Sequence, residues 1–271
     1  GRVVSAALAL WRREMIRFGR QPSRVVGVVL QPLLVWGIAA LGFSGIFHFP
    51  GVDQLRAAQF FFPGIIVMML LFNGIFSTIS VIEDRQAGFL QAALAGPSAR
   101  AGIVIGKILS SLTVGLGQCA LFLCLAPFAG FNLAATHWPL LVVAVVLTAA
   151  GCTLIGMIMA WRLKTSSAYH ALMSALLLPG WFLSGAVFPL PNAAPWGLLL
   201  RLNPFAWMVD LTRAAVYGPE LPSGLAEVMW PVPQTLPASL CQRAEGSDGG
   251  TGTPRAEVYT GNRARRTRSK G

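Results

Sequence analysis

Long apolar runs that carry no charged side chain divide this chain. No Asp, Glu, Lys or Arg occurs in residues 25–52, 57–82, 108–161 or 165–200. About 20 apolar residues in a helix cross the hydrocarbon core of a bilayer. The third run has 54 residues and is long enough for two crossings. We therefore predict an all-α polytopic membrane protein with at least five transmembrane helices, near residues 25–47, 60–82, 103–128, 138–161 and 168–188.

Composition supports this assignment and excludes a soluble globular domain. Hydrophobic residues make up 55% of the chain and charged residues only 11%, whereas soluble domains carry about 25% charged residues. The net charge of +11 is concentrated at the two ends, with six basic residues before the first predicted span and seven in residues 243–270. Basic groups beside spans set topology and bind lipid head groups. Membrane lipid, and not nucleic acid, is the expected partner.

The first 24 residues predict an amphipathic helix on the membrane surface. One stripe at spacings of three and four is apolar, and the opposite face is basic. The apolar stripe consists of Val4, Leu8, Trp11, Met15 and Phe18, and the basic face carries Arg12, Arg13, Arg17 and Arg20. Such a helix lies at the interface with its arginines toward phosphates. A soluble helix packed on another domain is the alternative.

The distribution of basic residues predicts the orientation of the spans. With the N-terminus inside, the cytoplasmic segments hold eleven basic residues and the opposite segments hold three. Short loops with such a bias fix orientation. We predict a multi-pass protein of the inner (plasma) membrane with a cytoplasmic N-terminus.

After the fifth predicted span the pattern changes twice. Prolines at 189, 191 and 195 prevent a continuous helix, because proline removes a donor and clashes with the preceding turn. Residues 189–204 therefore predict a re-entrant segment at the outer face, followed by an amphipathic helix over 205–217. The permease domain would thus comprise residues 25–217. Residues 218–271 are low in hydrophobicity and predict a disordered or aberrant tail, produced by truncation or a reading-frame change.

The chain carries no recognisable catalytic set. The glycines of Gly102–Ile108 are spaced one residue too closely for a phosphate loop, and Ile108 replaces the Ser or Thr that would bind magnesium. The three histidines lack neighbouring Asp or Cys, so we expect no metal site. The predicted spans contain no acidic residue, which argues against a proton-driven carrier. We expect no catalytic residue and no cofactor bound by this chain.

The segment from 83 to 102 is the main polar interruption between spans. Acidic residues head a predicted short cytoplasmic helix, Gly88 loosens it, and an apolar ridge follows. The residues concerned are Glu83, Asp84, Arg85, Gly88, Phe89, Leu90, Leu94 and Pro97. Apolar knobs flanked by charges suit docking into a groove of a partner. An ordinary charged loop between two spans is the alternative.

Two motifs resemble the ABC-2 type transporter permeases. The first runs from Glu83-Asp84-Arg85-Gln86-Ala87-Gly88-Phe89 through Gly96-Pro97-Ser98-Ala99-Arg100 to Gly106-Lys107 and is similar to that family's cytoplasmic loop. The second is Leu183-Ser184-Gly185-Ala186-Val187-Phe188-Pro189-Leu190, followed by Asn203-Pro204 and then Asp210 and Arg213. Together they cover roughly residues 5–217 and most resemble the drug- and lipooligosaccharide-export branch, which includes daunorubicin-resistance and nodulation-factor permeases.

The resemblance implies the membrane subunit of an ATP-driven exporter of amphipathic drugs, lipids or glycolipids. A separate ABC ATPase would bind ATP and Mg and grip the segment of Glu83 to Pro97 and the N-terminal helix. A second permease copy or a paralogue would complete the path. The outer gate would comprise Gly185, Phe188, Pro189, Asn203, Pro204, Asp210 and Arg213. The family has six spans, and we find no sixth here. A membrane anchor for a cytoplasmic enzyme and an ATP-independent carrier are the alternatives.

Overall fold

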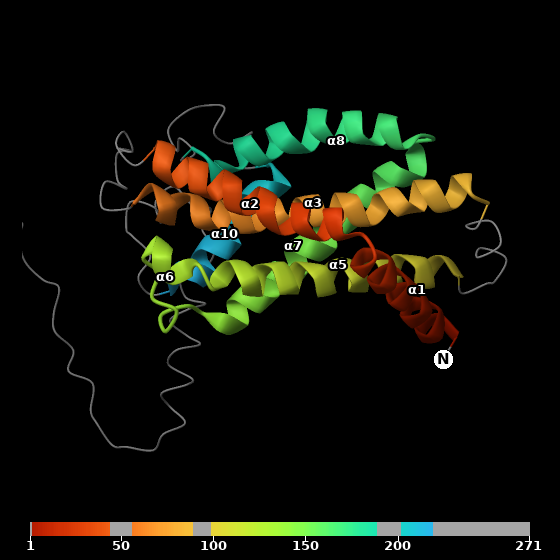
Figure 1. Cartoon of the computed structure of the whole chain (residues 1–271), viewed down its shortest axis with the longest axis horizontal. Helices are drawn as coiled ribbons and strands as arrows, with labels where there is room; N and C mark the ends of the chain where they lie inside the picture. Colours follow the sequence, from red (N-terminus) through yellow and green to blue (C-terminus); the bar gives the residue numbers. More distant parts are fainter. Residues whose placement is uncertain (1, 44–55, 89–98, 189–201, 219–271) are drawn as a thin grey trace, which may run out of the picture. The chain divides into compact units, whose positions relative to one another are not determined.

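The computed structural model is built from helices joined by short turns, with no strand, over the residues that it describes, which are 2–43, 56–88, 99–188 and 202–218. The chain divides into two units, Gly1–Pro233 and Gln234–Gly271, and the second lies wholly outside the described residues. The elements of the first unit (Figure 1) are α1 (Arg2–Gly19), α2 (Pro22–Gly42), α3 (Ala57–Gln86), α5 (Ala99–Leu123), α6 (Ala126–Ala129), α7 (Trp138–Arg162), α8 (Ser166–Trp181), the π-helical η1 (Phe182–Ala186) and α10 (Pro204–Tyr217).

Four of the described helices have the length and apolar composition of a membrane crossing. They cover Val25–Gly42, Ala57–Gln86, Ala101–Leu123 and Trp138–Arg162. This confirms the predicted class of an all-α polytopic membrane protein. The fifth predicted crossing, 168–188, corresponds to α8, which has 16 residues and continues directly into η1.

Prolines and polar caps mark where the helices begin. Proline occupies the first turn of α2, α7 and α10, where its missing N–H is not needed. The Thr165 hydroxyl accepts a hydrogen bond from the Ala168 amide at the start of α8, and the Asn203 side chain accepts one from the Phe205 amide at the start of α10. These caps satisfy amide groups that the first helical turn leaves without partners.

Helix α3 lies at the centre of the unit and contacts α2, α5, α7, α8 and α10 (Figure 1). Its span is 89% buried, whereas the α2 span is 6% buried. The indole of Trp36 in α2 packs edge-on against Phe62 of α3 and Phe122 of α5. The outward faces of α2, α5 and α7 expose large apolar side chains, as surfaces that meet lipid do.

Two predicted element boundaries differ from the structure. Glu83 and Asp84 do not head a short helix, because α3 continues through them and ends at Gln86, two residues before Gly88, which has a φ of +74°. A positive φ costs glycine least, so Gly88 stops the helix. The third predicted span, 103–128, is interrupted after Leu123, and α6 follows as a separate turn. The fourth predicted span matches α7 closely.

Most of the predicted re-entrant segment, 189–204, and of the predicted tail, 218–271, lies outside the described residues. The domain limits drawn from the sequence therefore stay predictions.

Candidate functional site

An ion-pair cluster of Arg13, Arg17, Glu83 and Asp84 joins α1 to the end of α3. The Arg13 guanidinium binds the Asp84 carboxylate through two hydrogen bonds of 2.8 and 2.7 Å. Arg17 pairs with Glu83 and lies 3.9 Å from Asp84. Two parallel N–H···O bonds are the strongest geometry that an arginine makes with a carboxylate. The cluster therefore fixes the register of α1 on α3.

The cluster also explains how α3 tolerates acidic residues in its last turn. The carboxyl end of a helix carries a partial negative charge, so Glu83 and Asp84 stand at the unfavourable end. Arg13 and Arg17 supply the opposite charge. The hydrogen bonds that the Arg13 guanidinium donates to the Asp84 carboxylate raise the pKa of Arg13. Arg13 therefore stays charged at physiological pH.

Two neighbouring residues join α3 to the end of α7. The Arg85 guanidinium donates to the carbonyl oxygens of Ala160 and Trp161, both at 3.3 Å, and to that of Leu163. The Gln86 amide donates to the carbonyl oxygen of Lys164 at 2.9 Å. The last carbonyls of a helix have no partner within the helix. Arg85 therefore acts as a C-terminal cap for α7.

The structure describes only part of the segment 83–97, which was predicted to bind the ATPase. Glu83, Asp84 and Arg85 all bind neighbouring helices, and Gly88 ends α3. Phe89, Leu90, Leu94 and Pro97 lie outside the described residues. The segment 83–97 therefore begins at a point that is bound to both α1 and α7.

The predicted interface helix, α1, makes contacts with α5 and α3 that its amphipathic pattern does not indicate. Arg13 and Arg17 bind carboxylates, so the expectation that their charges point toward phosphates is wrong for these two residues. Arg12 is exposed, Met15 is half-buried, and the Trp11 indole donates to the Thr113 hydroxyl at 3.0 Å. The exposed apolar residues Val4 and Leu8 leave a surface on which α1 can meet lipid.

The predicted outer gate is partly assembled around a buried arginine. Arg213 donates to the Gly185 carbonyl oxygen at 2.5 Å and lies 3.8 Å from Asp210. Asn203 caps α10 and donates to the carbonyl oxygen of Gly180, and Pro204 is the first residue of that helix. Phe188 is exposed. Pro189 lies outside the described residues.

We expect the buried member of the ion-pair cluster to contribute more to stability than the exposed one. The Asp84 side chain is 11% exposed and the Glu83 side chain 44%. Asp84→Asn should lower the free energy of unfolding by about 1.5–3 kcal/mol, because hydrogen bonds to a charged group are lost. Glu83→Gln is the matched control and should cost about 1 kcal/mol or less. Thermal unfolding of the detergent-solubilised chain measures both, and equal losses would contradict this ranking.

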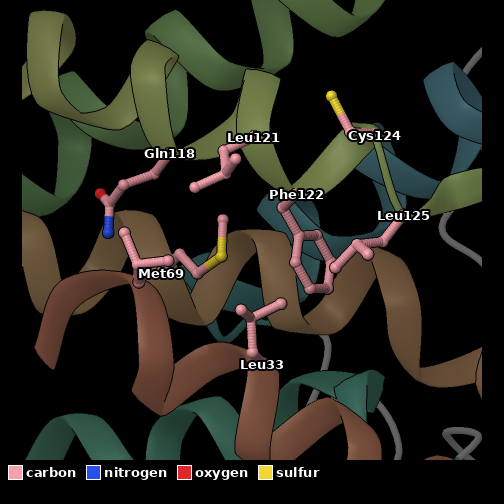
Figure 2. A pocket seen from close by; sticks show the side chains of 8 residues that line it. Leu33, Met69, Gln118, Leu121, Phe122, Cys124 and Leu125 are labelled. Atoms are coloured by element: carbon pink, nitrogen blue, oxygen red, sulfur yellow. The ribbon is translucent and has the colours of Figure 1, made fainter. Parts of the chain in front are cut away.

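An apolar cavity of about 270 Å³ lies between α2, α3 and α5. Leu33, Met69, Leu121 and Phe122 line it together with Gln118, which is polar. Figure 2 shows Gln118 at one side of this cavity and Phe122 at the other.

A second cavity of about 330 Å³ lies between α5 and α7, and Cys124 lines both. Trp138 and Leu141 of α7 face Leu116 of α5 across it. Both cavities border the lipid-facing sides of their helices. Such apolar hollows can accept hydrocarbon but not charged groups.

Sequence reasoning missed the pairing of Glu14 with Lys107. Lys107 is 3% exposed and lies 2.7 Å from the Glu14 carboxylate. The available signal was a single acidic residue among the arginines of the first helix. Glu14 shares a helical face with Ala7 and Leu10, which pack on α5.

Comparison with known proteins gives one consistent result. The sequence profile of a family described as ABC-2 type transporter matches residues 5–217. A protein of Cyanophora paradoxa named as a transport permease, ycf38, is 27% identical over 217 residues, which cover 78% of this chain and 73% of that protein. Its namesake in Porphyra purpurea is 25% identical over 218 residues, covering 78% and 74%. That of Pyropia yezoensis is 25% identical over 212 residues, covering 76% and 72%.

Proposed function

Because the chain belongs to the ABC-2 type transporter family, we propose that it is the membrane-spanning permease subunit of an ATP-driven exporter. A separate ABC ATPase would supply ATP binding and hydrolysis with Mg, and this chain would supply the path. A second permease copy or a paralogue would complete that path. The membrane would be the inner (plasma) membrane, with the N-terminus and the ion-pair cluster on the cytoplasmic side.

The observation that carries this proposal is the way in which the base of the segment 83–97 is anchored. Asp84 binds α1 through Arg13, and Arg85 binds the end of α7. A force applied beyond Gly88 would therefore reach α1, α3 and α7 at once. Packed helices respond to such a force as rigid bodies that shift between discrete arrangements. This arrangement fits a segment that an ATPase binds and moves better than it fits an ordinary loop between two spans.

The apolar cavities support an amphipathic substrate. Neither cavity is lined by a charged side chain. A drug, lipid or glycolipid could place hydrocarbon there while its polar part stays nearer the membrane surface. We infer that the chain works as exporters of the drug- and lipooligosaccharide branch would, which handle such molecules.

The decisive test is the replacement Phe89→Asp. Phe89 belongs to the apolar ridge that is expected to dock into the ATPase, and the replacement puts a charge at this interface. The chain should still fold, because Phe89 follows the end of α3. We expect ATP-dependent export in inside-out vesicles to fall at least tenfold while the ATPase retains its turnover. Export is followed with a fluorescent amphipathic drug, in vesicles that contain this chain and an ABC ATPase, sought first in the neighbouring reading frame.

Two controls make that result interpretable. Gln91→Asp places the same charge in the same segment, but at a polar position outside the apolar ridge of Phe89, Leu90 and Leu94. It should leave export largely intact. Melting temperatures of the purified variants should match that of the parent chain. Unchanged export by Phe89→Asp would reject the coupling role of the segment.

A carrier without an ATPase is the second candidate, and one observation favours it. The predicted spans contain no acidic residue, yet Lys107 is buried in α5 and paired with Glu14 of α1. Intramembrane ionisable groups often serve ion pathways. Transport that follows a proton gradient in vesicles lacking ATP would support the carrier and exclude the exporter.

A further inference from the structure

A small polar chamber lies where α1, α3 and α5 meet. Glu14, Asn73, Ser77 and Ser110 supply its polar lining. Its free volume is about 10 Å³, which is roughly the space that one water molecule requires. The chamber is distinct from the two apolar cavities, because its walls carry hydrogen-bonding groups.

A buried ion pair borders this chamber. The Lys107 ammonium lies 2.7 Å from the Glu14 carboxylate and also donates to the Ser80 hydroxyl. Lys107 is 3% exposed and Glu14 is 6% exposed. Buried charges need partners for every polar atom that they carry. Two partners for the ammonium are visible, while the carboxylate also faces the chamber.

The Ser77 hydroxyl lines the same chamber and needs a hydrogen-bond partner. Its oxygen is buried and makes no hydrogen bond with any of the described residues. Its neighbours are satisfied, since Ser110 donates to the Lys107 carbonyl oxygen at 2.9 Å and Asn73 donates to that of Ser111 at 2.7 Å. A buried hydroxyl without a partner destabilises the folded state. A water molecule in the chamber would remove that destabilisation.

Close helix packing holds the chamber in place. A Cβ atom on Gly102 would lie 3.0 Å from the Ala6 Cβ, and one on Gly106 would lie 2.9 Å from the Leu10 Cβ. Helices α1 and α5 therefore touch along the turns that precede Glu14 and Lys107. Their charges are brought together by this contact, away from bulk water.

We propose that the chamber binds one water molecule between the Ser77 hydroxyl and the Glu14 carboxylate, and that this hydrated Glu14–Lys107 pair fastens α1 to α3 and α5. The charge pattern is reciprocal: α1 presents arginines to the acidic end of α3 and a carboxylate to the lysine of α5. Only one register of α1 satisfies both sets of ion pairs. The fastening holds whether the protein is an exporter or a carrier.

The water is tested with Ser77→Ala and with a high-resolution electron cryomicroscopy map. We expect a density peak within hydrogen-bonding distance of Ser77 and Glu14 in the parent chain. Ser77→Ala should lower the melting temperature by about 2–4 °C, because a hydrogen bond to the water is lost. A dry chamber predicts the opposite, since the variant would then remove an unpaired buried hydroxyl. A parent map without that peak, or a Ser77→Ala melting temperature that is unchanged or raised, would overturn the water site.

The fastening role is tested by a disulfide between α1 and α5. The substitutions Ala6→Cys and Gly102→Cys place two thiols at the closest approach of these helices. In that background, Glu14→Gln should reduce the cross-linked fraction at least threefold, because an unpaired lysine would draw water into the contact. The exchanged pair Glu14→Lys with Lys107→Glu should recover at least half of it. Full cross-linking in Glu14→Gln, or no recovery in the exchanged pair, would overturn the fastening role.

Discussion

Replacing Arg213 with methionine is expected to lower the free energy of unfolding by about 3–5 kcal/mol. The Arg213 side chain is 1% exposed. Its guanidinium donates to the Gly185 carbonyl oxygen, lies 3.8 Å from Asp210 and stands over the Phe60 ring at 4.8 Å. Methionine fills similar space but leaves the Asp210 carboxylate and the Gly185 carbonyl without their cation. Loss of the monodisperse peak in detergent gel filtration after mild heating measures this effect.

The site allows a sharper test than a single variant. Gly185 lies within η1 and has a φ of +82°, and its carbonyl oxygen accepts the hydrogen bond from Arg213 of α10. If the cost arises because the buried Asp210 carboxylate loses Arg213, Asp210→Leu combined with Arg213→Met should recover more than half of the lost stability. Arg12→Met, at an exposed arginine, should change stability by less than about 0.5 kcal/mol. A double variant no more stable than Arg213→Met would show that Asp210 is not the source of the cost.

The second large effect is expected at the contact between α3 and α7. A Cβ atom on Gly74 would lie 3.0 Å from the Cys152 carbonyl carbon and 3.0 Å from the Thr153 amide nitrogen. Backbone atoms in the middle of a helix cannot move aside as a flexible side chain can. Gly74→Leu should therefore separate the two helices and cost about 3 kcal/mol or more. The yield of folded protein and its melting temperature report this loss.

Gly117 provides the matched control. It lies in α5, and no atom lies within 4 Å of a Cβ atom added there. Gly117→Leu should leave the melting temperature unchanged or raise it, since leucine is the better helix former. A similar loss from Gly74→Leu and Gly117→Leu would point to a general effect of leucine on membrane insertion and would contradict the packing argument.

The contact at Gly74 belongs to a layer of small and polar residues between α3, α7 and α8. The Thr78 hydroxyl lies 2.5 Å from the Tyr169 hydroxyl, and a Cβ atom on Gly156 would come within 2.6 Å of that same threonine oxygen. The glycine therefore admits a hydrogen bond between two other helices. Where hydrocarbon provides no hydrophobic drive between spans, such close contacts are what hold helices together.

The sequence alone was sufficient for the class of protein and for most span positions. A run of about 20 residues without charge is recognised from local composition, because hydrocarbon excludes charged groups wherever the helix is placed. The predicted limits 60–82 and 138–161 therefore lie within α3 and α7. Prolines at helix starts and Asn203 at the start of α10 are equally local signals.

What the tertiary structure alone decided is which charges meet. Arg13 and Arg17 were expected to face phosphates, because a helical pattern shows which face is polar but not what stands opposite. Their partners Asp84 and Glu83, and the Lys107 partner of Glu14, come from helices distant in sequence. Only the packing of α1 against α3 and α5 brings these groups within hydrogen-bonding distance. Burial then favours the paired state, because an unpaired charge away from water has a much higher free energy than an exposed one.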